Sequence, residues 1–367
     1  FFNKKYRQIS VIVVIIFLPI IISYIIYHSY EEKNNPVKVV VVQPNIDPYN
    51  EKFSGMEPEE QLKKMFGLAK QKTDSTTDYL IFPETALTEN IWENDISQTY
   101  SVCYIKNFLK QYPNINVVTG ALTLRSYSEK EKIPGTVRKM EQQKKYYDVF
   151  NTAICIGDTE KIQMYHKSKL VPGVERMPYP AVFGFLETCA IELGGTSGSL
   201  GTQEERTVFS AGKQNTNKNV APVICYESVF GEFVTEYIRS GASLICVITN
   251  DGWWGNTAGY KQHLLYGRLR AIESRRSIAR SANTGISCFI NQRGDILQPT
   301  IWWEEAVIKA DINSNTEKTF YVKYGDIIGR IAFYGSGIIL VFAVGMNFFL
   351  RRKKNDVQSD LSNDNLF

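Results

Sequence analysis

A cysteine stands where an apolar strand pattern meets a helical one. Residues 221–224 lead to Cys225, and apolar residues then recur at the spacing of one buried helix face: Phe230, Phe233, Val234, Tyr237 and Ile238. A thiol at such a junction lies near unpaired backbone N–H groups and the positive end of the helix dipole, which favour the thiolate and lower the pKa from about 8.5. Cys225 is therefore a candidate nucleophile. The alternative is a small buried core cysteine, and this stretch alone leaves both open.

A nucleophilic thiol needs a base, and the sequence offers two kinds. His166 and His263 are possible members of a Cys-His dyad. Glu84 ends the apolar strand pattern of residues 78–82 directly after a proline, where burial could raise its pKa enough to hold a proton near neutral pH. A salt bridge or a helix cap is the structural alternative for Glu84.

Acyl transfer also needs a group that stabilises an oxyanion. Lys167 follows a strand pattern and stands immediately before the segment Leu170-Val-Pro172, so a fixed ammonium there could serve. Most lysines are instead solvated on the surface, and that interpretation stays open for Lys167 at this point.

Two apolar runs are long enough to cross a bilayer. Residues 9–27 follow three basic residues, and residues 331–350 precede the basic segment 351–354. By the positive-inside rule both basic flanks are cytoplasmic, which predicts that residues 31–326 lie on the other side of the membrane. We expect a transmembrane helix over 1–30, a catalytic domain over 31–326, a second transmembrane helix over 327–352 and a cytoplasmic tail over 353–367. The tail is polar from residue 355 onward and is expected to lack regular structure there.

Between these runs, strand and helix patterns alternate. Apolar strand patterns at 37–42, 78–84, 116–120, 147–156, 161–165, 221–224, 244–249, 285–291 and 307–310 are interleaved with helical ones, including 263–278 and a segment that begins at Pro58. Strands buried on both faces with helices between them indicate an α/β fold with layered sheets.

Composition and cysteine spacing limit which partners and cofactors are expected. The 367 residues carry a net charge of only +4, which gives no support for a nucleic-acid partner. The six cysteines show no metal-finger spacing, and several occupy apolar core patterns, so we expect mostly free thiols. No metal and no organic cofactor is implied.

Four motifs in order resemble the nitrilase, or carbon-nitrogen hydrolase, superfamily and its Glu-Lys-Cys triad. They are Pro83-Glu84, Tyr165-His-Lys167, Cys225-Tyr-Glu227 and Asn250-Asp-Gly-Trp-Trp-Gly255. The resemblance covers roughly residues 37–310. It implies a four-layer α-β-β-α sandwich in which Glu84 is the general base, Lys167 the oxyanion lysine and Cys225 the nucleophile.

Three features are similar to one branch of that superfamily, the apolipoprotein N-acyltransferases. These are the flanking spans, the segment Leu170-Val-Pro-Gly-Val-Glu175, and the region from Gln262 to Ile286. The resemblance implies that Glu175, Glu227 and Tyr226 support the pocket, and we expect it to be lined also by Asn250, Trp253 and Trp254. Departures include Gly173-Val174 in place of Phe-Gly, Lys52-Phe53 where the branch often has a tryptophan, and Gly252 and Trp254 where Ala and Phe are commoner.

The branch resemblance implies a reaction and its partners. A fatty acyl chain would move from a phospholipid, through a cysteine thioester, to the α-amino group of a diacylglyceryl-apolipoprotein. The protein would be a multi-pass protein of the bacterial inner membrane with its catalytic domain on the periplasmic side, and the first span would be the last helix of an N-terminal membrane domain.

Other functions remain possible at this stage. A membrane-anchored hydrolase of amides or nitriles would share the triad, with water as acceptor. A catalytically inactive lipid-binding domain and a Cys-His protease are the further alternatives. The apolar segment 177–186 is expected to dip into the membrane surface beside the site, or to pack on the domain.

Overall fold

Two β-sheets form the centre of the larger of two structural units, residues 1–322. The computed structural model describes residues 2–53, 55–128, 131, 133–140, 145–157, 161–176, 199–211 and 216–363. The predicted membrane-dipping segment 177–186 and Cys189 lie outside these residues. The smaller unit, residues 323–367, is described separately below.

The first sheet has eight strands: β1 (Pro36–Gln43), β2 (Tyr79–Ile81), β3 (Leu87–Trp92), β4 (Asn116–Tyr127), β5 (Arg138–Met140), β6 (Lys145–Ile156), β7 (Gln163–His166) and β13 (Ala306–Asn313). Their order is β13-β1-β2-β4-β6-β5, with β3 paired to β4 and β7 paired to β6. β1, β2 and β4 are parallel, and β4 and β6 form a long antiparallel pair.

The second sheet has five strands: β8 (Val220–Ile224), β9 (Leu244–Thr249), β10 (Ile278–Ala282), β11 (Cys288–Ile290) and β12 (Ile296–Leu297). They lie in the order β12-β11-β10-β9-β8, and β8, β9 and β10 run parallel. Parallel strands place their carboxyl ends along one edge, and the residues that follow β8 and β9 are therefore neighbours.

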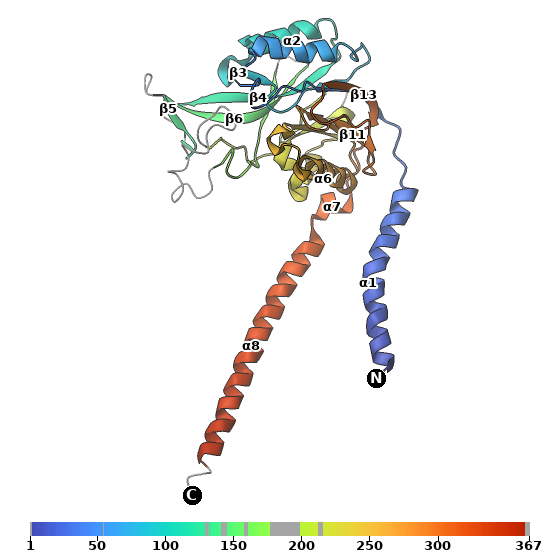
Figure 1. The fold of residues 1–367 in the computed structure, drawn as a ribbon, viewed down its shortest axis with the longest axis vertical. Coiled ribbons are helices and arrows are strands. Elements are labelled where there is room, and N and C mark those ends of the chain that lie inside the picture. Colours follow the sequence, from blue (N-terminus) through green and yellow to red (C-terminus); the bar gives the residue numbers. More distant parts are fainter. Residues whose placement is uncertain are drawn as a thin grey trace. The chain divides into compact units, whose positions relative to one another are not determined.

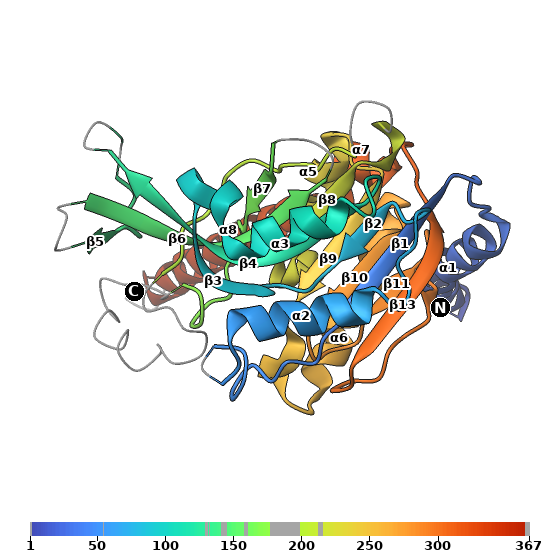
Figure 2. The same cartoon turned by 90° about the horizontal axis from the view of Figure 1, so that it is seen from above.

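Helices cover the outer faces of both sheets (Figures 1 and 2). α2 (Pro58–Ala69) and α3 (Tyr100–Leu109) pack on the first sheet, whereas α5 (Gly231–Arg239) and α6 (Ala258–Ser274) pack on the second. Side chains alternate along β1 accordingly, with Val39 and Val41 facing the second sheet and Val40 and Val42 facing the helices. The predicted four-layer α-β-β-α sandwich is confirmed.

Two boundaries differ from the sequence-based expectation. The helical pattern predicted over 263–278 begins earlier, at Ala258, and ends at Ser274, because Arg275 adopts φ +51° and stops it. Residues 278–282 form the buried strand β10. The sequence pattern did not indicate this strand, because it contains a charged residue and several small ones. Arg276 and Arg280 are each only 1% exposed, and hydrogen bonds to carbonyl groups or carboxylates make that burial possible.

The terminal helices are long and apolar. Within α1 (Phe2–Ser29) and α8 (Ile327–Asn363), residues 6–29 and 327–350 have the length and composition to cross a membrane. The tail is expected from its composition to lack regular structure from residue 355 onward, but α8 continues through it to Asn363. Short helical turns η1 (Glu93–Gln98), η3 (Thr216–Lys218), η4 (Cys225–Val229), η5 (Asp251–Trp254) and α7 (Phe320–Tyr324) complete the described elements.

The cysteines behave largely as expected. All five in the described residues are free thiols, namely Cys103, Cys155, Cys225, Cys246 and Cys288. Three of them are buried in the core, and Cys225 differs in being partly accessible from a cavity.

Candidate active site

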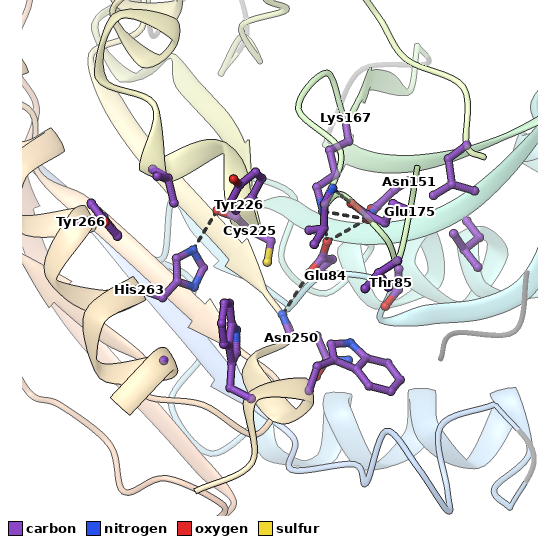
Figure 3. A pocket seen from close by; sticks show the side chains of 18 of the residues that line it. Glu84, Thr85, Asn151, Lys167, Glu175, Cys225, Tyr226, Asn250, His263 and Tyr266 are labelled. Carbon is purple, nitrogen blue, oxygen red and sulfur yellow. Dashed lines mark hydrogen bonds and ion pairs between the residues drawn. The ribbon is translucent and has the colours of Figure 1, made fainter. Parts of the chain in front are cut away.

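A cavity of about 400 Å³ lies where strands of both sheets end (Figure 3). Glu84 and Lys167 follow β2 and β7 of the first sheet, and Cys225 and Asn250 follow β8 and β9 of the second. Eight of the nine site residues predicted from the sequence line this cavity: Glu84, Lys167, Glu175, Cys225, Tyr226, Asn250, Trp253 and Trp254. The packing of the two sheets thus brings residues that are far apart in the sequence into one site.

Lys167 lies between two carboxylates. Its Nζ is 2.9 Å from Oε1 of Glu84 and 2.8 Å from Oε1 of Glu175. The side chains of Lys167 and Glu84 are only 1% and 7% exposed. At such burial, ion pairing offsets the desolvation of the charges only if hydrogen bonds also satisfy their remaining polar atoms.

Asn151, on β6, supplies part of that hydrogen bonding and was not predicted from the sequence. Its Nδ2 donates to Oε1 of both Glu84 and Glu175, at 2.8 Å each. The second oxygen of Glu84 accepts from the main-chain N–H of Asn250 at 3.0 Å. The signal that could have found Asn151 is strand pairing, because β7 runs beside β6 and the Lys167 N–H donates to the Asn151 carbonyl.

The charges of this cluster follow from its contacts. Burial alone would raise the pKa of Glu84, but Lys167 and the amide of Asn151 hold it below its usual value. Burial would lower the pKa of Lys167, but Glu175 and Glu84 raise it well above its usual value. Glu84 is therefore ionised at neutral pH, and the expectation that burial would let it hold a proton there is wrong.

Cys225 begins a tight turn directly after β8. Its φ of +49° lies in the left-handed region that residues other than glycine rarely adopt. The side chain points into the cavity beside Glu84 (Figure 3). The carbonyl oxygen points the other way and accepts hydrogen bonds from Ser228 Oγ at 2.8 Å and from His263 Nε2 at 3.0 Å.

The pKa of the Cys225 thiol is raised, which reverses the expectation drawn from its position before a helix. Burial is the main cause, and the negative charge of Glu84 adds to it, while Lys167 acts in the opposite direction. The turn after Cys225 is also a short 3₁₀ segment whose dipole is small. Cys225 therefore rests as a neutral thiol, and it would have to lose its proton to act as a nucleophile.

Glu227 lies behind the cavity and does not line it. It is fully buried. One carboxylate oxygen accepts from the Ile224 N–H at 2.9 Å, and the other accepts from the Ser168 N–H at 2.7 Å and from the Tyr165 hydroxyl at 2.6 Å. Glu227 thus ties the Cys225 turn to the segment that carries Lys167, which is a positioning role.

His263 contacts the main chain of Cys225. Its Nδ1 is 2.9 Å from Oδ1 of Asp251, and Arg280 donates to the other oxygen of that carboxylate at 2.5 Å. Burial would raise the pKa of Asp251, but Arg280 and His263 hold it well below its usual range. Because Nε2 faces the Cys225 carbonyl, this network supports the strained turn rather than forming the predicted Cys-His dyad.

His166 is directed elsewhere. Its Nε2 is 2.7 Å from Oε1 of Glu93, and its ring stacks on Phe150 with centroids 4.2 Å apart. It does not line the cavity, so the geometry gives neither histidine the position of a base for the thiol.

Aromatic side chains form much of the remaining wall. Tyr226 packs edge-to-face on Phe230, and Trp253 packs edge-to-face on Tyr49. Trp254 is 44% exposed and lies against Gly259, where a Cβ would come within 2.3 Å of its ring. The cavity wall therefore has a charged part, formed by the carboxylates and Lys167, and an apolar and aromatic part.

Residues 38–321 match the carbon-nitrogen hydrolase family. The chain belongs to this family. Among solved structures, Saccharomyces cerevisiae Nit3, described as a member of branch 10 of the nitrilase superfamily, has the same fold, with a TM-score of 0.51 at 17% identity over 76% of this chain and 90% of that one. The carbon-nitrogen hydrolase fold accounts for the four layers.

Curated relatives of this carbon-nitrogen hydrolase carry a more specific name. The apolipoprotein N-acyltransferase of Chlorobaculum tepidum is 29% identical over 94% of this chain, and that of Geobacter metallireducens is 27% identical over 91%. The chain spans 65% and 59% of the length of these two relatives, which is less than two thirds.

Replacing Glu227 by Ala should destabilise the domain. The buried N–H groups of Ile224 and Ser168 lose their acceptor, so the free energy of unfolding should fall by about 3 kcal/mol. Urea unfolding of the detergent-solubilised protein measures the change, with the exposed Glu60→Ala as the matched control. Equal unfolding midpoints for the two variants would contradict the tie between the two segments.

Replacing His263 by Ala should slow modification of Cys225 by iodoacetamide about tenfold, because the turn loses one of the bonds that hold it. Peptide mass spectrometry measures the rate at Cys225, and His166→Ala should match the wild type. If His263 is instead the base of a dyad, His263→Ala abolishes acylation while Glu84→Gln remains active, and our assignment fails.

Proposed function

We propose that this chain is an apolipoprotein N-acyltransferase that moves a fatty acyl chain from a phospholipid to the α-amino group of a lipidated N-terminal cysteine. The observation that carries the proposal is the position of a neutral thiol, an ionised carboxylate and a buried ammonium in one cavity with an apolar mouth. Relatives bearing that name match more than nine tenths of the chain.

The first half-reaction forms a thioester. Glu84 takes the proton of the Cys225 thiol as the sulfur attacks the ester carbonyl carbon of the phospholipid. The negative charge moves to the carbonyl oxygen, where the ammonium of Lys167 and main-chain N–H groups stabilise it. The carbon–oxygen ester bond then breaks, the lysophospholipid alkoxide takes the proton from Glu84, and the acyl group stays on Cys225.

The second half-reaction transfers the acyl group to nitrogen. The neutral α-amino group of the acceptor attacks the thioester carbon, and Glu84 takes the proton that the nitrogen gives up. The carbon–sulfur bond breaks, and the sulfur leaves with that proton as the restored thiol. An amide bond has formed, and no cofactor is required at either step.

An exposed apolar surface supports a lipid substrate. Leu265, Leu269 and Ile272 recur at helical spacing on α6 and are 47%, 47% and 40% exposed. Tyr266, on the same helix, lines the cavity and is 39% exposed, and Trp254 flanks it. Exposed apolar side chains of α6 thus lie on the same helix as residues that line the cavity, and we propose that this α6 surface contacts the bilayer.

The membrane arrangement is part of the same proposal. α1 and α8 each contain a stretch long and apolar enough to cross a bilayer, and basic residues flank both stretches on their terminal sides. We propose that residues 31–326 lie on the periplasmic side of a bacterial inner membrane.

Incubating the purified wild-type protein with phospholipid should add one fatty acyl group, whereas Cys225→Ala should add none. Intact mass measures the adduct, and hydroxylamine should remove it because thioesters are labile to that reagent. No adduct, together with ammonia release from amide substrates, would overturn the proposal in favour of a hydrolase that uses the same three residues with water as acceptor.

Replacing both Leu265 and Leu269 by Ser should lower acyl transfer from phospholipid vesicles at least tenfold, since each leucine contributes about 1.5–3 kcal/mol when it leaves water. Acylation by the soluble ester 4-nitrophenyl butyrate should be unchanged. Ile301→Ser is the control, because Ile301 is 63% exposed outside α6. Equal losses with both acyl donors would contradict a membrane-contacting role.

A further inference from the structure

Lys52 is a second buried lysine, after Lys167, and it lies beside Glu84. It is 2% exposed, and its Nζ donates to the main-chain carbonyl of Glu84 at 3.0 Å and to the hydroxyl of Thr85 at 2.6 Å. Its own carbonyl accepts from Gln61 Nε2 of α2 at 2.8 Å, so helix packing fixes the lysine backbone. The mechanism described above does not use this ammonium.

The contacts of Lys52 are unusual for a buried charge. Both of its hydrogen-bond acceptors are neutral, and within the described part of the chain no carboxylate lies at ion-pair distance from its Nζ. Burying an ammonium costs several kcal/mol unless nearby groups compensate the charge. If the position only had to be filled, a leucine or methionine could pack there without that cost. The charge itself is therefore the property to be explained.

Charge balance supplies the explanation. Lys167 is shared by Glu84 and Glu175, so these three groups together carry a net charge of −1. The positive charge of Lys52 brings the buried cluster to zero, and its field favours ionised Glu84. Asp251 and His263 also act near the thiol: the Asp251 carboxylate raises the pKa of Cys225, and His263 contacts the Cys225 carbonyl from the side away from Glu84 (Figure 3).

The same ammonium holds a strained turn. Thr85, directly after the base, has φ +48°. Gly120 of β4 allows this turn to approach closely, because a Cβ there would come within 2.4 Å of the Thr85 nitrogen. Lys52 bonds both residues of the turn, Glu84 through its carbonyl and Thr85 through its hydroxyl.

We propose that Lys52 is a positioning residue that fixes the Glu84–Thr85 turn and, through its charge, adds to the effect of Lys167 in favouring the ionised form of Glu84. The inference rests on the Glu84–Cys225 chemistry of the proposed function but not on the identity of the acyl donor or acceptor. It assigns Lys52 no contact with substrate.

The proposal has consequences at both ends of the pH range. Removing the positive charge raises the pKa of Glu84, so a variant without it loses active carboxylate at a pH where the wild type is still ionised. Burial lowers the pKa of Lys52 itself to about 8. Above that pH the charge disappears, and the negative charge that develops at Cys225 loses a neighbouring cation.

The experiment measures the first-turnover rate of Cys225 butyrylation by 4-nitrophenyl butyrate between pH 3 and pH 9.5, read by intact mass, so that the range extends below the usual pKa of a glutamate. For Lys52→Met we expect about a tenfold lower rate at the optimum and an acid limb that moves up by about one unit. Lys52→Arg should keep the wild-type acid limb. It should also lack the fall in rate above pH 8, because arginine does not lose its charge there.

Superimposable pH profiles for the wild type, Lys52→Met and Lys52→Arg would overturn the proposal. If Lys52→Met does not fold, the Lys52→Arg profile decides alone, since an unchanged fall above pH 8 contradicts the role of Lys52. Thr85→Val keeps the charge and removes one acceptor, so it should retain both limbs. Because butyrylation does not require a phospholipid, failure of lipid transfer alone would count against the proposed function and not against Lys52.

Discussion

A buried ammonium between two buried carboxylates is the interaction on which the rest of the site depends. Lys167 can remain charged at 1% exposure only because Glu84 and Glu175 both contact it and Asn151 bonds both carboxylates. Removing Lys167 would leave two buried carboxylates without their shared cation, which costs more than the intact cluster gains. The geometry of the cluster is consequently strict, and the chain segments that carry it must be held rigidly.

The two-sheet packing supplies that rigidity. The first sheet contributes Glu84, Asn151 and Lys167 through three strands whose register is fixed by backbone pairing. The second sheet contributes Cys225 at the end of a fully buried strand. Glu227 joins the two halves, since its carboxylate bonds N–H groups on both sides. The distance between nucleophile and base is thus a property of the sandwich and not of a flexible loop.

Much of the fold, and the meeting of Glu84, Lys167 and Cys225 in one cavity, could be predicted from the sequence, and the remainder could not for physical reasons. Most buried strands are visible in the sequence as apolar runs, and the residues that follow several of them match motifs of a known superfamily. β10 was missed because Arg280 is buried by pairing with Asp251, a partner that the local pattern does not reveal. Lys52 and Asn151 act through residues distant in the sequence. The predicted direction of the Cys225 pKa shift was wrong. The sequence shows that Cys225 precedes a helix, but it does not show that the thiol is buried beside the charge of Glu84.

That reversed pKa changes how the nucleophile works. A thiolate stabilised before substrate arrives would be open to oxidation and to unrelated electrophiles, since the thiolate is the reactive form. In this site the thiol holds its proton, and an ionised Glu84 stands beside it with its own proton affinity lowered by Lys167. Proton transfer is therefore unfavourable until a carbonyl group is present to take up the negative charge near Lys167. Reactivity is coupled in this way to occupation of the cavity, which favours acyl substrates that reach its apolar mouth over small reagents in water.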